Sequence, residues 1–311
     1  MDITISVSVG VAQYPESATT TLDLINCAEI VMFKAKGLGK DAIQFFDAPI
    51  LSEFLQNVNI ETKLKGAVFS ENFTINFQPQ YYVGSRKMRG VEALIRWKDQ
   101  DGKMISPSVF IPIAEKNGTI VPIGNWVIEE SIRIFASWKK KYKCDVVLSL
   151  NISAIQYMRD DFIDSLLAII KKYEVNPAEL ELEITESVLI ENFKEVTRKL
   201  HILRDYGIKI SLDDFGTGYS SLSYLKGLPI DTLKIDKSFI DTIILDENTR
   251  VITESIVFMV KKLGFETIAE GVETDEQFEY LKNIGCDCIQ GYLLGKPVES
   301  EKIEELLSHQ L

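Results

Sequence analysis

The chain has 311 residues, 46% of them hydrophobic, which is enough for a full-size core and, by length, for one or two domains. Its formal net charge of −12 argues against broad binding to a DNA or RNA polymer or to an anionic membrane surface. No run approaches the ~18 consecutive apolar residues of a membrane span, and no basic segment precedes an apolar signal core. We therefore expect a soluble, cytoplasmic protein whose four cysteines are reduced thiols.

Residues 1–47 predict a strand, a helix and a second strand. Apolar residues alternate from Ile3 to Val11, which is typical of a half-buried strand. A segment with helical spacing follows, with apolar positions at Leu22, Ile25, Ala28 and Met32. The run "AIQFFD" then returns to strand character, and residues 48–62, after Pro49, are typical of a connecting helix. One strand, one helix and one strand are too few to bury a core alone.

From about residue 73, short apolar runs alternate with helical patterns. The runs are "FTINFQPQY", "RGVEALIRW", "VVLSLNIS", "LELEIT", "KISLDD", "TLKID", "ETIAEG" and "CIQGY". Eight strands interleaved with helices over roughly 235 residues predict an α/β fold, a TIM-like (β/α)₈ barrel. A doubly wound open sheet is the alternative, but no G-x-G-x-x-G fingerprint follows the first strand.

Polar residues stand at or near the end of each run. They are Gln78, Glu92, Asn151, Glu183, Asp213 with Asp214, Lys234, Glu270 and Gln290. In a barrel the functional face lies at the C-terminal ends of the strands. Five carboxylates in one mouth repel one another and raise each other's pKa unless something compensates them. Divalent cations resolve this conflict, so the pattern predicts a metal site.

The donor types indicate which metals. All candidate ligands carry oxygen, and the two histidines, His201 and His309, fall outside the group. Such a set suits Mg²⁺, Mn²⁺ or Ca²⁺ rather than zinc. Adjacent aspartates, one able to bridge, fit a pair of ions about 3.5–4 Å apart, as in phosphoryl hydrolysis. Lys234 could orient or activate a water or neutralise an oxyanion, and Arg96 offers a planar fork for a phosphate.

Each residue also has a plainer interpretation. Asn151, followed by Ser153, could cap the next helix. Asp213 and Asp214 could be turn and N-cap residues, and Lys234 an inward salt-bridge partner. It is the joint placement at corresponding ends of successive strands that carries the metal-site interpretation.

Six ordered motifs resemble those of a known family. They are "VEALIRW" (91–97), "NISAIQ" (151–156), "LEITES" (182–187), "DDFGTGYSSLSYLKGLPIDTLKIDKSFI" (213–240), "AEGVET" (269–274) and "QGYLLGKP" (290–297). They look like the signatures of the EAL-domain family, cyclic-di-GMP phosphodiesterases on a TIM-like barrel, and the resemblance covers about residues 60–311. Departures are slight: Phe77 stands where many relatives have Tyr, and Ile95 where many have Leu.

The resemblance implies hydrolysis of cyclic-di-GMP to linear pGpG by water activated between two Mg²⁺ or Mn²⁺ ions. It assigns the first ion to Glu92, Asn151, Glu183 and Asp213, and the second to Asp213, Asp214 and Glu270. The catalytic set is Lys234, which contacts the attacking water, with Glu270, Glu92 and Asp213. It places Gln78, Arg96, Gln290 and Pro297 at the dinucleotide. Glu186 matches the acid that holds the loop after strand five, and Glu273 an outer-shell acid.

Residues 1–47 are similar to the last strand, helix and strand of a GGDEF diguanylate cyclase domain, without its signature motif. The predicted organisation is a GGDEF-like fragment without an active site (1–47), a connecting helix (48–62) and an EAL domain (63–311). We expect the chain to be part of a longer signalling protein with upstream domains, which could tether it to a membrane. Apolar surface is expected to be exposed on the fragment. The resemblance also implies a homodimer.

Two other hypotheses stay open at this point. One is a catalytically silent receptor that binds the dinucleotide and signals through partner domains. Such receptors in the family usually lack several metal ligands, whereas this chain has the complete set. The other is a different metal-dependent barrel enzyme such as an aldolase, for which neither a Schiff-base lysine nor a sugar-phosphate loop is evident.

Overall fold

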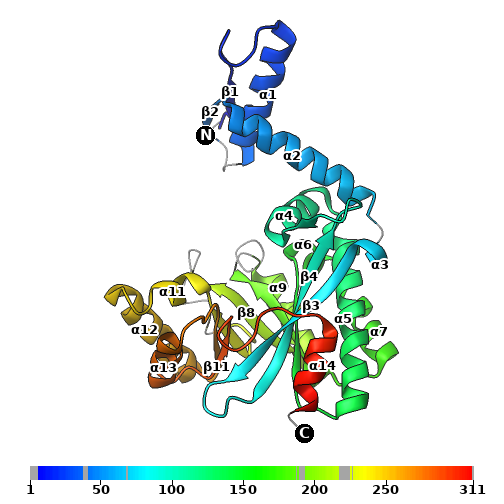
Figure 1. Ribbon diagram of the computed structural model, residues 1–311, viewed down its shortest axis with the longest axis vertical. Coiled ribbons are helices and arrows are strands. Elements are labelled where there is room, and N and C mark those ends of the chain that lie inside the picture. Colours follow the sequence, from blue (N-terminus) through cyan, green and yellow to red (C-terminus); the bar gives the residue numbers. More distant parts are fainter. Residues whose placement is uncertain are drawn as a thin grey trace. The chain divides into compact units, whose positions relative to one another are not determined.

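A computed structural model of the chain (Figure 1) describes residues 6–37, 41–67, 69–186, 188, 193–216, 225 and 227–309. The chain divides into two compact units. The smaller comprises Met1–Ala67 with Ser108–Ala114, and the larger comprises Val68–Pro107 with Glu115–Leu311. The domain boundaries predicted at residues 47 and 62 stay predictions.

The smaller unit contains the predicted strand, helix and strand. Strand β1 (Val9–Val11) pairs in parallel with β2 (Ile43–Phe45), and helix α1 (Thr21–Gly37) connects them. Residues 3–5 of the predicted first strand lie outside the described residues. Helix α2 (Ala48–Lys65) follows the second strand, and the Asp47 side chain caps it by accepting a hydrogen bond from the Ile50 amide.

The apolar stripe of α1 agrees with the predicted one only at Ala28 and Met32. Three residues one turn apart are buried: Cys27, Val31 and Ala35. Leu22 and Ile25, expected on the inner face, are instead 69% and 52% exposed. The reason is where the helix meets the sheet. A Cβ on Gly10 of β1 would lie 2.0 Å from the Ala28 oxygen and 2.5 Å from the Met32 nitrogen, so this contact lies beyond the turns that carry Leu22 and Ile25.

The larger unit is a closed barrel of eight strands. They are β3 (Phe73–Tyr82), β4 (Met88–Lys98), β6 (Val147–Asn151), β7 (Leu180–Thr185), β8 (Lys209–Phe215), β9 (Thr232–Ile235), β10 (Glu266–Ala269) and β11 (Cys288–Gln290). The order is β3-β11-β10-β9-β8-β7-β6-β4, and the β3–β4 pairing closes the ring. The short β5 (Met104–Ile105) pairs with β4 outside the ring. The predicted TIM-like barrel and its eight strand runs are confirmed.

One strand runs against the others. Strand β3 is antiparallel to both of its neighbours, β4 and β11, whereas the remaining pairs of the ring are parallel. Gln78 therefore lies in the middle of β3, directly opposite Glu92 on β4, and not at the C-terminal end of a parallel strand. The polar residue predicted on β3, Gln78, nevertheless lies beside the one predicted on β4, Glu92.

Helices surround the strands (Figure 1). They are α3 (Phe69–Asn72), α5 (Ile120–Tyr142), α6 (Ala154–Met158), α7 (Phe162–Tyr173), η1 (Pro177–Glu179), α9 (Phe193–Asp205), α11 (Lys237–Thr242), α12 (Glu247–Leu263), α13 (Asp275–Asn283) and α14 (Ser300–Ser308). Most of α4 (Pro107–Asn117) is assigned to the smaller unit. The predicted face of α5, with Ile128, Ile132 and Phe135, is buried. Thr274 and Gln277 form a capping box at the start of α13. Among the described residues, none of the helices has the length and apolar character that a membrane crossing needs.

The strands are buried on both faces, and their two faces differ chemically. In β7, Leu180, Leu182 and Ile184 alternate with Glu181 and Glu183, and all five are at most 1% exposed. Because successive side chains point to opposite faces of a strand, the leucines and the isoleucine lie toward the helices and the glutamates toward the barrel interior. The interior is therefore lined with polar groups, and these must find partners there.

Candidate active site

A lysine occupies the centre of a group of acids at one end of the barrel. The Lys234 side chain on β9 is 1% exposed, and its Nζ lies 2.6 Å from Glu270 Oε1 and 2.7 Å from Glu183 Oε2. Asp213 Oδ1 is 3.2 Å away and Glu92 Oε2 3.6 Å away. We call Lys234 together with Glu92, Glu183, Asp213, Asp214 and Glu270 the acid cluster. An ammonium has three N–H donors, so four carboxylates compete for them.

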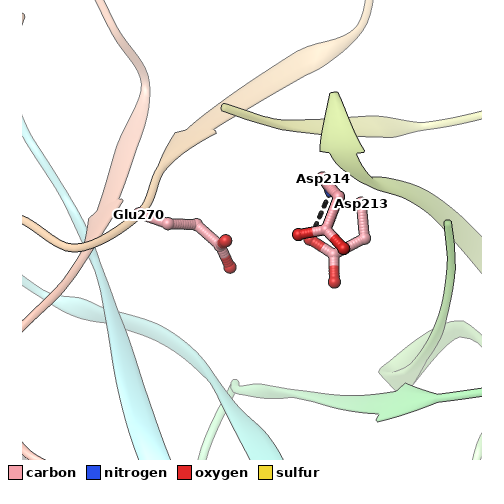
Figure 2. A group of neighbouring side chains, drawn as sticks. All are labelled: Asp213, Asp214 and Glu270. Carbon is pink, nitrogen blue, oxygen red and sulfur yellow. Dashed lines mark hydrogen bonds between the residues drawn. The ribbon is translucent and has the colours of Figure 1, made fainter. Parts of the chain in front are cut away.

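Two of these acids are adjacent on β8. Asp214 has a positive φ of 54°, and its amide donates to Asp213 Oδ1 at 3.0 Å. This left-handed residue breaks the alternation of the strand, so that both carboxylates reach the same space. Figure 2 shows them facing Glu270, which follows β10. One carboxylate oxygen from each of the three residues lies within 4.8 Å of the others.

The backbone next to this pair depends on a glycine. Gly216, one residue after the end of β8, has a φ of 100°, and a Cβ there would lie 2.6 Å from the Phe239 ring. Both the dihedral angle and the space therefore require glycine. The second glycine of the motif, Gly218, lies outside the described residues.

Glu92 is held from both sides by amides. Its Oε1 accepts a hydrogen bond from Asn151 Nδ2 at 2.5 Å, and its Oε2 accepts one from Gln290 Nε2 at 2.6 Å. Asn151 does not cap the next helix. Ser153 caps α6 instead, because its hydroxyl accepts a hydrogen bond from the Ile155 amide. Asn151 and Glu92 thus come together as predicted from their positions in successive runs.

The pKa values of the acids diverge. Burial by itself raises the pKa of Glu92, but the Lys234 charge and the bonds from Gln290 and Asn151 outweigh it and bring that pKa below its ordinary range. Burial and the neighbouring Glu92 carboxylate raise the pKa of Glu183. Burial, only partly offset by Lys234, raises the pKa of Glu270 to about 8. Burial and Asp213 raise that of Asp214.

Lys234 remains the cation of the cluster. Burial lowers its pKa, but the surrounding carboxylates, Asp213 and Glu183 foremost, outweigh this and hold its pKa well above the ordinary value. The ammonium is therefore charged at neutral pH and cannot act as a base there. Five carboxyl groups surround one buried ammonium, so the acid cluster has surplus negative charge once Glu183 and Glu270, whose pKa values are raised, lose their protons.

The residues of the acid cluster fit divalent cations. Glu183 Oε1 is buried and has no hydrogen-bond donor among the described residues, which is costly unless a positive group joins it. Together with the crowded ammonium and the Asp213–Asp214–Glu270 group, this leaves several oxygen donors available to a cation. Hard oxygen donors without histidine or thiolate suit Mg²⁺, Mn²⁺ or Ca²⁺.

The residues predicted at the substrate lie along the same end of the barrel. Gln78 donates from Nε2 to the Gly295 oxygen at 3.1 Å. Pro297 precedes Val298, whose amide and carbonyl form a two-bond bridge with Phe77 of β3. Gln290 is 5% exposed and bonds to Gln78, Gln80 and Glu92. Gln290 is thus held beside β3 by its own hydrogen bonds, and Pro297 by those of the next residue, Val298.

Arg96 lies on β4, four residues after Glu92. Its Nη1 donates to the Ile95 oxygen at 2.9 Å. Burial lowers its pKa, and the charges of Tyr292 and Glu92 act in the opposite direction. The guanidinium remains ionised, since its ordinary pKa lies far above neutral, and it is half-buried near both groups.

The two outer acids have different surroundings. Glu186 follows β7 directly and is half-buried, but most of the loop it was predicted to hold, residues 217–224, lies outside the described residues. Glu273 forms an ion pair with Lys237 of α11, and its amide donates to Gln277 Oε1 at 2.8 Å. Gly271 lies under the same lysine, because a Cβ there would be 2.3 Å from Lys237 Cγ. Glu273 thus ties the segment after β10 to α11.

A second buried ion cluster was missed by the sequence reasoning. Arg89 of β4 forms a bidentate pair with Glu181 of β7, at 2.8 and 2.7 Å, and bonds to Glu266 at 2.7 Å. Completing this group, which we call the arginine cluster, are Gln80, Ser149 and Thr232. The one available signal was the "LELEIT" alternation, which places Glu181 on the same face as Glu183.

Fold and site together define a class: a TIM-like barrel with a carboxylate-rich site at one end. The family model "EAL domain" matches residues 61–297, and the chain therefore belongs to the EAL family. The family resemblance inferred from the motifs is confirmed. The GGDEF-like assignment of residues 1–47 stays a prediction.

Curated relatives are longer than this chain. It is 39% identical over 305 residues to the signaling protein YkoW of Bacillus subtilis, covering 98% of this chain and 38% of the relative. It is 36% identical over 302 residues to the bifunctional diguanylate cyclase/cyclic di-GMP phosphodiesterase MucR of Pseudomonas aeruginosa, covering 97% and 44%. The chain thus spans about two fifths of the length of these two relatives.

Solved structures agree with the barrel. The PaMucR phosphodiesterase in a c-di-GMP complex superposes with a TM-score of 0.76 and 38% identity, covering 79% of this chain and 99% of that chain. The EAL enzyme Bd1971 in its cAMP-bound form gives a TM-score of 0.78 and 28% identity, covering 94% and 76%.

Proposed function

We propose that this chain is a metal-dependent phosphodiesterase that hydrolyses cyclic-di-GMP to linear pGpG in bacterial second-messenger signalling. The observation that carries the proposal is the complete acid cluster around Lys234. Membership of the EAL family supports it. So do the names of relatives such as MucR and the cyclic di-GMP phosphodiesterase NbdA of Pseudomonas aeruginosa, which is 32% identical over 305 residues.

Two Mg²⁺ or Mn²⁺ ions are proposed as cofactors. The residues that would hold them are Glu92, Asn151, Glu183 and Asp213 for one ion, and Asp213, Asp214 and Glu270 for the other. Bound in this way, such ions supply Lewis-acid polarisation of the phosphate and a lower pKa for the attacking water. Support comes from the donor chemistry, from the unpartnered Glu183 Oε1 and from the proximity of the Asp213, Asp214 and Glu270 oxygens.

Lys234 is proposed to orient the attacking water by donation and to hold its own proton throughout. Its high pKa excludes a role as a base at neutral pH. Because it lies between Glu183 and Glu270, a water bound among these acids would have an N–H donor within reach. The same charge offsets negative charge that develops on the phosphate in the transition state.

The dinucleotide is proposed to lie over Gln78, Arg96, Gln290 and Pro297. Arg96 supplies a planar cation suited to a phosphate. Gln290 and Gln78 are bonded to each other at 3.1 Å, so both amides act as one unit next to Glu92. Glu186 is proposed to hold the loop that follows β8, and Glu273 to hold the segment after β10 through Lys237.

The proposal is tested with purified chain, cyclic-di-GMP and Mn²⁺, with products separated by chromatography. We expect pGpG in the presence of Mn²⁺ and none after chelation. Glu92→Ala should lose both Mn²⁺ binding and turnover, whereas Lys234→Ala should lose turnover and keep Mn²⁺. His201→Ala, on the exposed face of α9, is the neutral control. Tight binding of the dinucleotide without any pGpG would establish the silent receptor in place of the enzyme.

The setting of this activity is proposed to be cytoplasmic, since cyclic-di-GMP is an intracellular messenger. We also propose a homodimer and additional signalling domains in the full-length protein, which agrees with the greater length of the relatives. Sedimentation of the chain at high concentration tests the dimer, and a purely monomeric distribution would contradict it.

A further inference from the structure

The acid cluster and the arginine cluster are joined by two buried glutamines. Arg89 Nη1 donates to Gln80 Oε1 at 2.9 Å, and Gln80 Nε2 donates to Gln290 Oε1 at 3.0 Å. Gln290 Nε2 then donates to Glu92 Oε2 at 2.6 Å. Gln80 and Gln290 are direct partners in the antiparallel pair of β3 and β11. Each of the four residues, Arg89, Gln80, Gln290 and Glu92, is at most 5% exposed, so water cannot replace these bonds.

The direction of this chain of bonds follows from its two ends. A guanidinium can only donate, so Gln80 must turn its oxygen toward Arg89 and its amino group toward Gln290. Gln290 must then accept with its oxygen and donate with its nitrogen. The ionised Glu92 at the other end can only accept. An amide flip at either glutamine would set two donors or two acceptors against each other, which in a buried site is expensive.

Arg89 itself is immobilised. The β3–β4 register places Gln80 opposite Gly90 and Tyr81 opposite Met88, so that Arg89 is the extra residue of a bulge. Bulges re-aim side chains, and this one turns Arg89 into the interior, although it lies an odd number of residues from Glu92. Its five N–H groups make five bonds, to Gln80, Glu266 and Thr232 once each and to Glu181 twice.

We propose that Arg89 is a positioning residue for the cation site: through Gln80 and Gln290 it keeps an N–H donor on Glu92 Oε2 and so fixes this carboxylate for a divalent cation. Asn151 performs the corresponding task on Oε1. The inference deepens the proposed function and rests on it, because it concerns a ligand of the proposed ions. Gln80 and Arg89 touch neither substrate nor cation in this scheme and act only through Gln290.

The test removes the connection and leaves both ends in place. In Gln80→Met, Arg89 keeps its bonds to Glu181, Glu266 and Thr232, while Gln290 loses the donor to its Oε1 and is held, apart from Glu92, by its bond to Gln78. Loss of a partner behind a metal ligand typically costs 10–100-fold in metal affinity, and we expect the Kd of Mn²⁺ to rise about tenfold. The measurement is calorimetric titration of cation-free protein with Mn²⁺ and without nucleotide.

Two further variants separate positioning from general loosening. Thr232→Val removes a bond to Arg89 and one to Glu181 but leaves the glutamines intact, so it should lower stability without changing the Kd for Mn²⁺ more than about twofold. Gln80→Glu is close to isosteric and keeps the contact with Arg89. Ionised beside the guanidinium, it has no N–H for Gln290 and should raise the Kd at least as much as Gln80→Met.

The outcomes are distinguishable. A Kd that rises in both Gln80 variants but not in Thr232→Val supports the relay. An unchanged Kd in whichever Gln80 variant folds would overturn it while leaving the proposed phosphodiesterase intact. An equal rise in Thr232→Val would also overturn it, because the effect would then reflect loosening of the barrel. A wild-type chain that binds no Mn²⁺ would overturn the relay and the proposed cofactors together.

Discussion

The barrel buries two ion clusters, and they are built on opposite principles. In the arginine cluster, one guanidinium has five donors and each of them meets an acceptor. In the acid cluster, one ammonium with three donors faces four carboxylates, and Glu183 Oε1 has no donor among the described residues. Both contain a central cation among glutamates, yet only the first is complete in itself.

The difference shows which cluster serves the fold and which serves a ligand. A buried group that is fully paired costs little once formed, whereas breaking it leaves an uncompensated charge. A buried group with surplus charge is unfavourable until something binds there, and natural proteins keep such conflicts at functional sites. The same substitution should therefore have opposite effects on stability in the two clusters.

The largest expected effect on stability is that of Glu181→Gln in the arginine cluster. It removes the bidentate partner of Arg89 in the dry interior, and breaking a buried pair in this way costs about 3 kcal/mol or more of unfolding free energy. Urea unfolding with cations removed measures it. The exposed pair Arg198–Glu195 provides the matched control, since Glu195→Gln should leave the unfolding midpoint unchanged. Equal small shifts in both variants would contradict the distinction between the clusters.

Glu270→Gln, the same change in the acid cluster, should act in the opposite direction. Burial raises the pKa of Glu270 from 4.5 to about 8, so the folded chain holds this proton more tightly than the unfolded chain. The associated stability is complete below pH 4.5 and is lost as the pH rises through 8. At pH 9 without cations, the variant should therefore be more stable than the wild type, by about 1 kcal/mol or more.

The gain in stability should accompany a loss of function. Glu270 is a proposed ligand and lies against Lys234, so turnover with Mn²⁺ should fall by more than about 100-fold, the upper range for partners that lie behind a ligand. Thermal unfolding at pH 5 and pH 9, together with product formation, measures both parts. Lower stability of Glu270→Gln at pH 9 would show that its charge is compensated within the fold.

Proton competition at the acid cluster is the next effect in size. A cation must displace the proton of Glu270, whose pKa is raised to about 8, so the affinity for Mn²⁺ should rise with pH between pH 6 and 8. One displaced proton corresponds to at most about a tenfold change per pH unit. Calorimetry in two buffers of different ionisation enthalpy counts the protons released. An affinity that stays constant between pH 6 and 8 would contradict the raised pKa.

The acid cluster could be anticipated from the sequence because its signal is local. Polar residues such as Asn151, Glu183 and Asp213 each end a short apolar run, and a parallel barrel brings such ends to one face. Lys234 and Glu270 follow the same rule. The positions of these residues at the strand ends therefore predicted most of the acid cluster, without knowledge of any side-chain contact.

The arginine cluster could not be anticipated because it depends on pairing between distant strands. Arg89 enters the interior through a bulge in the β3–β4 register, and β3 is reversed relative to the other strands of the ring, a direction that no single run encodes. The predicted inner face of α1 was only partly right, for a related reason. Of its four apolar positions, Ala28 and Met32 contact β1, whereas Leu22 and Ile25 are exposed, because only the folded sheet sets where the contact lies.

The last test of the comparison uses two serines, one of which, Ser211, should show the smallest effect. Ser149 and Ser211 are both 0% exposed on barrel strands. Ser149 Oγ donates to Glu181 at 2.9 Å, whereas Ser211 Oγ has no hydrogen-bond partner among the described residues. Ser149→Ala should lower the unfolding free energy by about 1.5–3 kcal/mol, as for a bond to a charged group.

Ser211→Ala should cost nothing or stabilise the fold, because it removes a buried hydroxyl that gains nothing from its surroundings. Urea unfolding of the cation-free protein measures the unfolding free energy of both variants. Each variant is the control for the other, because both lose one hydroxyl oxygen. If Ser211→Ala were as destabilising as Ser149→Ala, the Ser211 hydroxyl would have to form a stabilising hydrogen bond near Asp213. The acid cluster would then be better compensated than its surplus of carboxylates indicates.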